Sequence, residues 1–355
     1  MADELIEALK ALKARKLSAV RSAIQAKPEA ARHPRAILAA AGQAFLPGVK
    51  LLHRHGADLN ASYRNYRPLH ALLQEDPHAE AGHPKPERLE CLEWLLENGA
   101  DPEQPGAWPA ARAIIIAAFV GRPEYVERLK RGGAKIDGFA GAALGDRKLV
   151  EKTLRTNPEF ARERDGGLLT ALQCAAGSRL AGAAGVEIAA LLLDRGADVA
   201  ARTKSWAHEV NAAYFAARKG GDAMFELLLD RGADATDAVS HAVWGGHYEL
   251  ARLALAHGAE LDRATANGKP LLNDLIRWGQ IPQALWMIEH GASPNIRDEM
   301  GWTAAHQAAS RGSARLMKAV LDAGADLTRK DRGGHLPIDV ARVARREKLL
   351  AMMGV

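Results

Sequence analysis

The side chains best suited to chemistry lie between residues 206 and 307 of this 355-residue chain. Aromatic, imidazole, carboxyl and amide groups are spread along that stretch: Trp206, His208, Tyr214, Phe215, His241, Trp244, Asn273, Asp274, Trp278, Trp302 and Gln307. Aromatic residues mixed with polar ones are typical of a binding surface, so we predict that this set contacts a ligand. The alternative is that some of the tryptophans only fill the space left by a short finger loop.

Two members of this set could also do catalysis. A histidine and a carboxylate can exchange protons with a substrate, so His241 and Asp274 are the candidates for an acid–base pair between tryptophan walls. The sequence lacks the motifs that are typical of several other enzyme classes. The chain has no Gly-rich phosphate loop, no Gly-x-Gly-x-x-Gly and no Gly-x-Ser-x-Gly, and His208-Glu209 is not followed by a histidine at position 212. We therefore expect no cofactor and no metal, and we regard an enzyme as the less favoured alternative.

A repeated dipeptide indicates the elements that must carry these residues. Gly-Ala occurs eleven times, and eight of these form a spaced series, nearly always after a leucine-rich helical stretch: at Gly56, Gly99, Gly133, Gly196, Gly232, Gly258, Gly291 and Gly324. The steps between successive glycines are 43, 34, 63, 36, 26, 33 and 33 residues. A recurring period near 33 residues predicts a solenoid, in which each repeat buries its apolar face against the next. The step of 63 residues indicates one repeat that lacks the dipeptide.

The clearest repeat runs from Gly301 to Asp326. It reads Gly-Trp-Thr-Ala-Ala-His-Gln-Ala-Ala-Ser-Arg-Gly, and a second helical stretch then ends in Gly-Ala-Asp. This resembles the ankyrin repeat, whose pattern is Gly-x-Thr-Pro-Leu-His-x-Ala-Ala-x-x-Gly-His followed by Leu-Leu-x-x-Gly-Ala-Asp. The matching positions are Thr303, His306, Ala308, Ala309 and Gly312, and residues 68–73 and 170–177 carry parts of the same pattern.

The resemblance implies an all-α fold, a curved α-solenoid of about ten to eleven ankyrin repeats. Each repeat would be a helix-turn-helix with a β-hairpin or loop that projects as a finger. A single array would span residues 1–355, with a helical N-terminal cap over 1–31, repeats over 32–330 and a helical C-terminal cap over 331–355.

Two repeats depart from the family pattern. Residues 138–164 and 236–263 are too short to hold a full finger, so we predict gaps in the finger row and tighter local curvature there. Elsewhere Thr303 is expected to cap its helix, and the glycine of each Gly-Ala is expected to end the second helix of a repeat.

The resemblance also places the candidate residues. In an ankyrin repeat the position after the pattern's histidine, and those three and four further on, face the concave groove. Between residues 203 and 312 those positions hold much of the set named above, together with Arg218, Lys219, Arg277, Ser310 and Arg311. The histidine of the pattern is structural, so His70 and His306 are expected to bind the backbone of an adjacent loop. A smaller aromatic cluster is Tyr63, Tyr66 and Trp108.

Charge and composition narrow the class of partner. The chain has 48 basic and 43 acidic residues, and its net charge of +5 is not concentrated in the basic stripe typical of nucleic-acid binding. The longest apolar run, Ala113–Val120, is too short to span a bilayer, and the N-terminus does not read as a secretory signal. We therefore expect a cytoplasmic protein that binds neither nucleic acid nor membrane, with Cys91 and Cys174 reduced.

The leading functional interpretation is a non-enzymatic scaffold that binds a protein or peptide partner on its concave face, as ankyrin repeats chiefly do. The alternative is an enzyme or small-molecule-binding protein whose pocket on that face is lined by Trp, His and Asp residues of the stretch 206–307. A deep pocket around those residues would favour the alternative, and an open surface would favour the scaffold.

Overall fold

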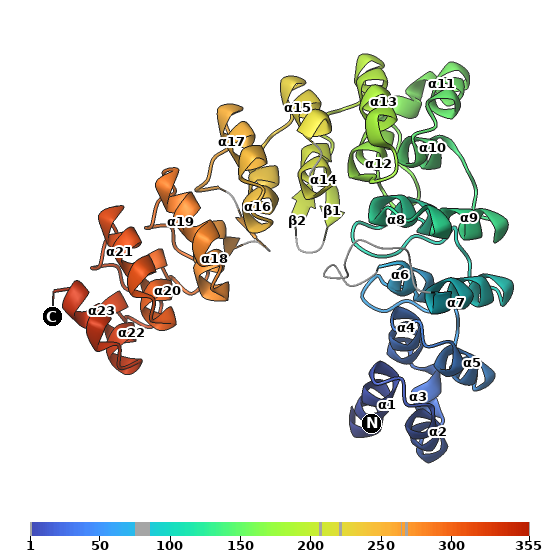
Figure 1. Cartoon of the computed structure of the whole chain (residues 1–355), viewed down its shortest axis with the longest axis horizontal. Helices are drawn as coiled ribbons and strands as arrows, with labels where there is room; N and C mark the ends of the chain where they lie inside the picture. The colour runs from blue at the N-terminus through green and yellow to red at the C-terminus, as the bar shows by residue number, and fades with distance from the viewer. Residues whose placement is uncertain are drawn as a thin grey trace. The chain divides into compact units, whose positions relative to one another are not determined.

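The computed structural model describes residues 2–74, 86–205, 208–219, 222–263, 265–266 and 269–354. These residues form 23 α-helices, one short 3-10 helix and four short strands, so the predicted helical fold is confirmed (Figure 1). The helices belong to two compact units, Met1–Trp206 and Ala207–Val355.

The first unit stacks helix pairs in two rows. Its helices are α1 (Ala2–Lys13), α2 (Leu17–Ala26), α3 (Glu29–Arg32), α4 (Pro34–Gly42), α5 (Leu46–Arg54), α6 (Pro68–Leu73), α7 (Pro86–Glu97), α8 (Ala113–Val120), α9 (Pro123–Arg131), α10 (Gly138–Leu144), α11 (Arg147–Thr156), α12 (Ala171–Gly177) and α13 (Gly182–Asp194), with a 3-10 helix at Pro158–Arg162 and strand β1 at Thr203–Ser205. Helices α4, α6, α8, α10 and α12 form the first-helix row, and α5, α7, α9, α11 and α13 form the second-helix row.

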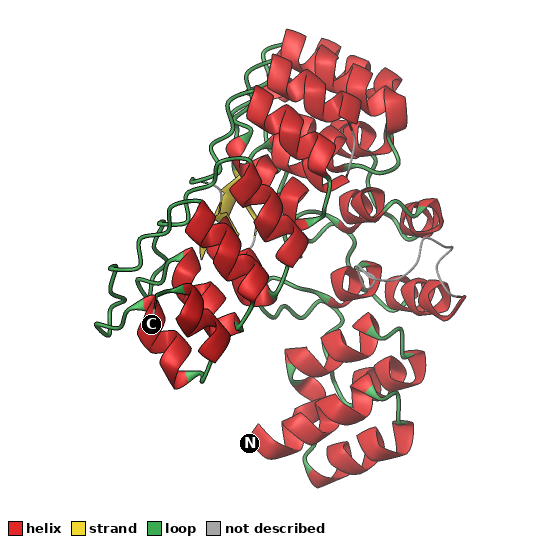
Figure 2. Cartoon of the chain, turned by 60° about the vertical axis from the view of Figure 1, so that its left-hand side comes forward, coloured by secondary structure: helices red, strands yellow, loops and turns green. Residues whose placement is uncertain are grey.

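The second unit repeats this arrangement. Its elements are β2 (His208–Val210), α14 (Ala212–Lys219), α15 (Asp222–Asp230), α16 (Thr236–Trp244), α17 (Tyr248–Ala256), β3 (Thr265–Ala266), β4 (Lys269–Pro270), α18 (Leu271–Trp278), α19 (Ile281–Glu289), α20 (Ala304–Arg311), α21 (Ala314–Asp322), α22 (Pro337–Val343) and α23 (Glu347–Met352). Its first-helix row is α14, α16, α18, α20 and α22, and Figure 2 shows the helices as red coiled ribbons joined by green loops.

Alanines at the centre of the first helices set the close spacing of the stack. The pairs Ala142-Ala143, Ala175-Ala176, Ala216-Ala217 and Ala308-Ala309 are all fully buried. Because a methyl group occupies little volume, neighbouring first helices can approach closely over these positions. The free cysteines Cys91 and Cys174 are also buried, as expected for small apolar side chains.

The local signals read from the sequence have the predicted conformations. All eight glycines of the spaced Gly-Ala series, from Gly56 to Gly324, have positive φ angles, from 81° to 97°, where a side chain would be strained. Thr303 is the N-cap residue of α20, and Thr170 caps α12 by accepting a 3.2 Å hydrogen bond from the Gln173 backbone N–H. These contacts lie within a few residues of one another, which is why sequence alone could identify them.

We call the long loop or hairpin that precedes a first helix a finger. A full finger spans residues 290–303 before α20, whereas only residues 132–137 precede α10 and only residues 231–235 precede α16. The prediction that residues 138–164 and 236–263 lack a full finger is therefore confirmed. In the described part of the chain, no helix combines the length and the apolar character needed to cross a membrane.

Candidate binding site

The structure places the candidate residues on the first-helix row of the second unit. Helix α14 carries Tyr214 and Phe215, α16 carries His241 and Trp244, α18 carries Asn273, Asp274 and Trp278, α20 carries Gln307, and Trp302 lies in the finger before α20. Trp206 lies outside the described residues, and so does the side chain of His208, whose backbone begins β2.

Three of these aromatic side chains pack against one another at the start of the unit. Tyr214 and Phe215 are buried, and their rings meet edge to face with centres 5.6 Å apart. The ring of His241 lies 4.8 Å from the ring of Tyr214. Burial of this kind stabilises the stack, so it supports the packing role for Tyr214 and Phe215 rather than direct contact with a ligand.

The amides of the set hold the fingers in place. Asn273 donates from Nδ2 to the carbonyl oxygens of Trp302 and Ile296, at 2.8 and 3.2 Å. Gln307 donates from Nε2 to Asp298 Oδ2 at 3.2 Å. Both side chains are buried, so their polar atoms fix the finger before α20 and are not available to a ligand.

The histidines of the repeat pattern have the structural role that the resemblance implied. His70 donates from Nε2 to the Ala111 carbonyl at 2.8 Å, and His306 donates from Nε2 to the His335 carbonyl at 3.2 Å. Burial lowers the pKa of His70 to about 4 and also lowers the pKa of His306, against the opposing effect of these hydrogen bonds. Both rings are therefore neutral at pH 7, and each holds the backbone of an adjacent loop by a hydrogen bond.

Trp278 differs from the other aromatic residues of the set because it is 61% exposed. It is the last residue of α18, and the guanidinium carbon of Arg277 lies 5.8 Å from the centre of its ring. Arg311 of α20 donates from Nη1 to the Arg277 carbonyl at 3.3 Å. A Cβ at Gly279 would collide with the Arg311 guanidinium, so the glycine lets the arginine lie across the end of α18. We call Asp274, Arg277, Trp278 and Arg311 the Trp278 cluster.

Asp274 lies one helical turn before Trp278 and is buried. Burial raises the pKa of its carboxyl group, while the charges of Arg277 and Lys269 and a hydrogen bond from Trp278 act in the opposite direction. The indole of Trp278 is thus hydrogen-bonded to the carboxyl group of Asp274, and the guanidinium of Arg277 lies beside its ring. This arrangement fixes the ring orientation while its face stays open to solvent.

His241 and Asp274, the acid–base candidates from the sequence, have different described neighbours. Among the described contacts of Asp274 there is no hydrogen bond or ion pair with His241, which packs instead on Tyr214. Two pockets lie on the second-helix side of the first unit, and neither of these two is lined by residues of the stretch 206–307. Among the residues that the structure describes, no three His, Cys, Asp or Glu side chains gather to hold a metal ion.

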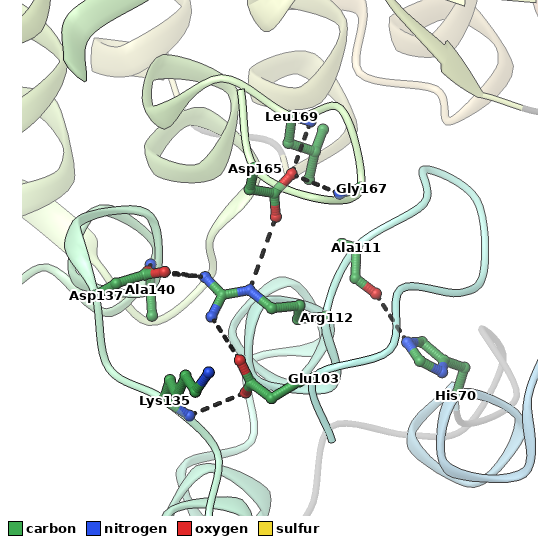
Figure 3. A network of polar contacts seen from close by, with 10 residues as sticks. All are labelled: His70, Glu103, Ala111, Arg112, Lys135, Asp137, Ala140, Asp165, Gly167 and Leu169. Carbon is green, nitrogen blue, oxygen red and sulfur yellow. Dashed lines mark hydrogen bonds and ion pairs between the residues drawn. The ribbon is translucent and has the colours of Figure 1, made fainter. Parts of the chain in front are cut away.

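The first unit contains a charged cluster that the sequence reasoning missed (Figure 3). Arg112, only 6% exposed, directs its guanidinium at three carboxylates from three successive repeats. It donates from Nη2 to both oxygens of Asp137 at 2.7 and 2.9 Å, donates from Nη1 to Glu103 Oε2 at 3.3 Å, and lies 4.0 Å from Asp165 Oδ2 through Nε. We call these four residues the Arg112 network.

The Arg112 network occupies the place where the finger before α10 is short. Arg112 ends the finger before α8, Asp137 is the N-cap of α10, and Asp165 lies in the finger before α12. A Cβ at Gly167 would collide with the carbonyl of Ala110, so the two flanking fingers touch across the gap. The network therefore joins loops that a full finger would otherwise separate.

Burial changes the pKa values of two residues of the Arg112 network, Asp165 and Arg112. Burial raises the pKa of Asp165, opposed by hydrogen bonds from the Leu169 and Gly167 backbone and by the charge of Arg112. Burial alone would lower the pKa of Arg112, but the hydrogen bond and charge of Asp137 raise it. Since Asp165 is only 7% exposed, we assign this network to loop positioning rather than to contact with a ligand.

One signal in the sequence could have pointed to Arg112. Threonine stands immediately before α12 and α20, at Thr170 and Thr303, whereas Arg112 stands immediately before α8. Arginine also stands immediately before α6, at Arg67, which donates to the carbonyl oxygens of Pro105 and Asn60, so an arginine at this position indicates hydrogen bonds to loop groups but not by itself an anion. Asp137 and Asp165 could not be identified as partners from that signal because they come from other repeats.

Two family models match parts of the chain. The model described as ankyrin repeats in many copies matches residues 284–341, which include α20, and the model described as an ankyrin repeat matches residues 168–204, which include α12. Both matches therefore contain one of the threonine-capped first helices.

Curated proteins share shorter regions with the chain. It is 28% identical over 117 residues to the protein phosphatase 1 regulatory subunit 27 of Mus musculus, a match that covers 32% of this chain and 76% of that protein. It is 36% identical over 67 residues to the potassium channel GORK of Arabidopsis thaliana, covering 19% of this chain and 8% of the channel. The similarity to the channel is thus confined to a small part of that protein.

A solved structure supports the same fold. The ankyrin repeat domain of Bcl-3, described as a unique member of the IkappaB protein family, aligns with a TM-score of 0.51 and 23% sequence identity. The alignment covers 61% of this chain and 99% of that domain. This similarity concerns the architecture of stacked helix pairs.

Proposed function

Because the chain is an ankyrin-repeat protein, we propose that it binds a protein or peptide partner, and that the Trp278 cluster on the first-helix face of its second unit makes the contact. The observation that carries this proposal is the 61% exposure of Trp278. A large aromatic surface left in water gains free energy when a partner covers it, and Trp and Arg are the residues most enriched where binding energy concentrates.

The geometry of the cluster favours recognition because it is preorganised. Trp278 is held by its helix, by the hydrogen bond to Asp274 and by the stacked Arg277. A side chain that is already fixed loses little conformational entropy on binding. The exposed indole therefore presents a rigid anchor rather than a mobile side chain.

The chemistry of the partner follows from the side chains around the indole. Arg277 and Arg311 are exposed and place two cations beside Trp278. We infer a partner surface with an apolar socket for the indole and at least one carboxylate beside it, since a guanidinium binds carboxylates through paired hydrogen bonds. Trp244, which is half-buried at the end of α16, belongs to the same face and is a secondary candidate.

The relatives give this proposal further support. The mouse protein that matches 117 residues is named as a regulatory subunit of a protein phosphatase, that is, as a component that acts together with another protein. Neither of the two pockets in the first unit is lined by residues of the stretch 206–307, so these two do not support the alternative of an enzyme or small-molecule site there.

The test is affinity capture from a lysate of the native host with three baits: the wild-type chain, Trp278→Ala and Val343→Ala. Val343 is the matched control, because it is an apolar residue of the same row that is 87% exposed and lies outside the cluster. We expect a partner retained by the wild type and by Val343→Ala but lost with Trp278→Ala, at an unchanged melting temperature. Equal retention by all three baits would contradict the proposal.

A further inference from the structure

A pocket of about 510 Å³ lies on the second-helix side of the first unit, where α2, α5 and α7 pack together. Its floor is apolar, formed by the partly exposed side chains of Leu17, Leu46 and Leu51. Apolar surface that remains open between packed helices is available for burial by another molecule. This pocket belongs to a different row of helices and a different unit from the Trp278 cluster.

Four cations surround that floor: Arg15, Arg21, Lys50 and Arg54. None of them forms an ion pair with a described carboxylate. Arg15 lies 5.9 Å from the centre of the Phe45 ring, and Lys50 lies 5.9 Å from the centre of the Trp94 ring. Glu87 and Glu90 also line the pocket, so its four cations and two carboxylates leave an excess of positive charge.

The neighbouring pocket, between α7 and α9, shows the contrast. There Arg128 Nε lies 3.0 Å from Glu93 Oε1, and Arg131 Nη2 lies 3.9 Å from the same oxygen. Its cations are thus paired with a carboxylate of the chain itself. The α2–α5–α7 pocket differs because Glu87 and Glu90, on its α7 side, make no such pair with its cations.

We propose that the α2–α5–α7 pocket binds an acidic amphipathic helix of a partner protein. The apolar stripe of such a helix covers Leu17, Leu46 and Leu51, and its carboxylates pair with Arg21 and Arg54 at the rim. A base at one end of the helix pairs with Glu87 or Glu90. A nucleic-acid backbone fits less well, because it has no apolar stripe for the floor and would face the two glutamates.

The proposal is independent of the Trp278 cluster, so its test uses a defined probe. The probe is a fluorescein-labelled peptide of about 14 residues with leucines at helical spacing, glutamates on one flank and lysines in the last turn. Fluorescence anisotropy measures its affinity for the full-length chain and for three variants: the double variant Arg21→Ala/Arg54→Ala, Arg131→Ala and Trp278→Ala. Arg131→Ala is the matched control, since Arg131 is an exposed arginine of the neighbouring pocket.

We expect the double variant to bind the peptide about fivefold more weakly or worse, as the loss of two exposed charge pairs predicts. Arg131→Ala and Trp278→Ala should bind it as the wild type does, and a peptide with glutamine in place of every glutamate should bind weakly to all. Arg21 and Arg54 are exposed, so the double variant should keep the wild-type circular dichroism spectrum.

Three outcomes would overturn the proposal. The first is no binding of the acidic peptide to the wild type, and the second is an affinity that the double variant leaves unchanged. The third is a single-stranded oligouridylate that binds the wild type, is lost with the double variant and is not displaced by the peptide. A failure confined to Trp278→Ala in the capture experiment would leave this result untouched, so the two proposals fail separately.

Discussion

Arg112 donates two hydrogen bonds from a single guanidinium nitrogen to the two carboxylate oxygens of Asp137, at 2.7 and 2.9 Å. Asp137 Oδ1 also accepts the Ala140 backbone N–H at 3.0 Å and so caps α10. One carboxylate therefore begins a helix and fixes the arginine of the preceding repeat. This pairing takes the place of the contacts that a full finger would make before α10.

The first prediction concerns Arg112 itself. Arg112→Met should lower the free energy of unfolding by about 3 kcal/mol, because it leaves the buried carboxylate of Asp165 without its cation and also removes the pairs with Asp137 and Glu103. The midpoint of urea unfolding measures the loss. Arg112→Lys should recover little of it, since an ammonium group cannot contact Asp137 and Glu103 together as the guanidinium does.

The control for Arg112 is Arg131→Met, which removes an exposed arginine 3.9 Å from Glu93. An exposed ion pair contributes only about 0–1 kcal/mol, so this variant should be close to the wild type. If Arg112→Met were no more destabilising than Arg131→Met, the network would not be holding the fingers together.

The second prediction is a pH dependence due to His70. Burial lowers the pKa of His70 to about 4 from 6.5, so below pH 6.5 the unfolded chain binds a proton that the native state does not. The stabilising contribution of neutral His70 is complete above pH 6.5 and is lost as the pH falls to about 4. The full loss corresponds to about 3 kcal/mol.

His70→Gln tests this dependence, because Gln173 makes the equivalent contact in α12 by donating from Nε2 to the Ala201 carbonyl at 2.9 Å. The urea midpoint of the wild type should fall more steeply between pH 7 and pH 4.5 than that of His70→Gln. His306 titrates in both proteins, so the difference between the two curves isolates His70. Parallel curves would show that His70 takes up its proton in the folded state.

The third prediction concerns Leu168, which has a φ angle of 70° and is 62% exposed at the tip of the finger before α12. A left-handed conformation strains any side chain with a Cβ, and glycine removes that strain. Leu168→Gly should therefore be more stable than Leu168→Ala by about 1 kcal/mol. The melting temperatures of the two variants measure this difference. If Leu168→Ala were at least as stable as Leu168→Gly, the left-handed conformation of residue 168 would not be strained.

The fourth prediction compares two tryptophans of consecutive helices. Trp278 is 61% exposed, whereas Trp286 is 6% exposed and stacks between Tyr248 and His290, with ring centres 5.5 and 4.0 Å away. Trp286→Ala should cost about 3–5 kcal/mol because it opens a cavity. Trp278→Ala should change the free energy of unfolding by less than about 1 kcal/mol. Similar losses in both variants would mean that Trp278 serves packing rather than binding.

The candidate site was only partly predictable from the sequence. The repeat pattern placed Phe215, Asn273 and Trp278 on one row of helices, and the structure confirms that row. It did not separate their roles: Phe215 is buried, Asn273 binds the next finger and Trp278 faces solvent. Exposure depends on which side chains of the neighbouring repeat lie over a position, and a pattern within one repeat carries no information about them.

By itself, the sequence determined the repeat architecture, the left-handed glycines that end the second helices and the two shortened fingers. These features depend on φ angles, helix caps and loop lengths, which involve residues close together in the chain. Only the tertiary structure decided that Arg112 meets Asp137 and Asp165, that Trp278 stays exposed, and that four cations without an ion pair to a described carboxylate surround one pocket. Those relationships join separate helices and loops, and their energies depend on burial and on distances between groups that the stacking of repeats brings together.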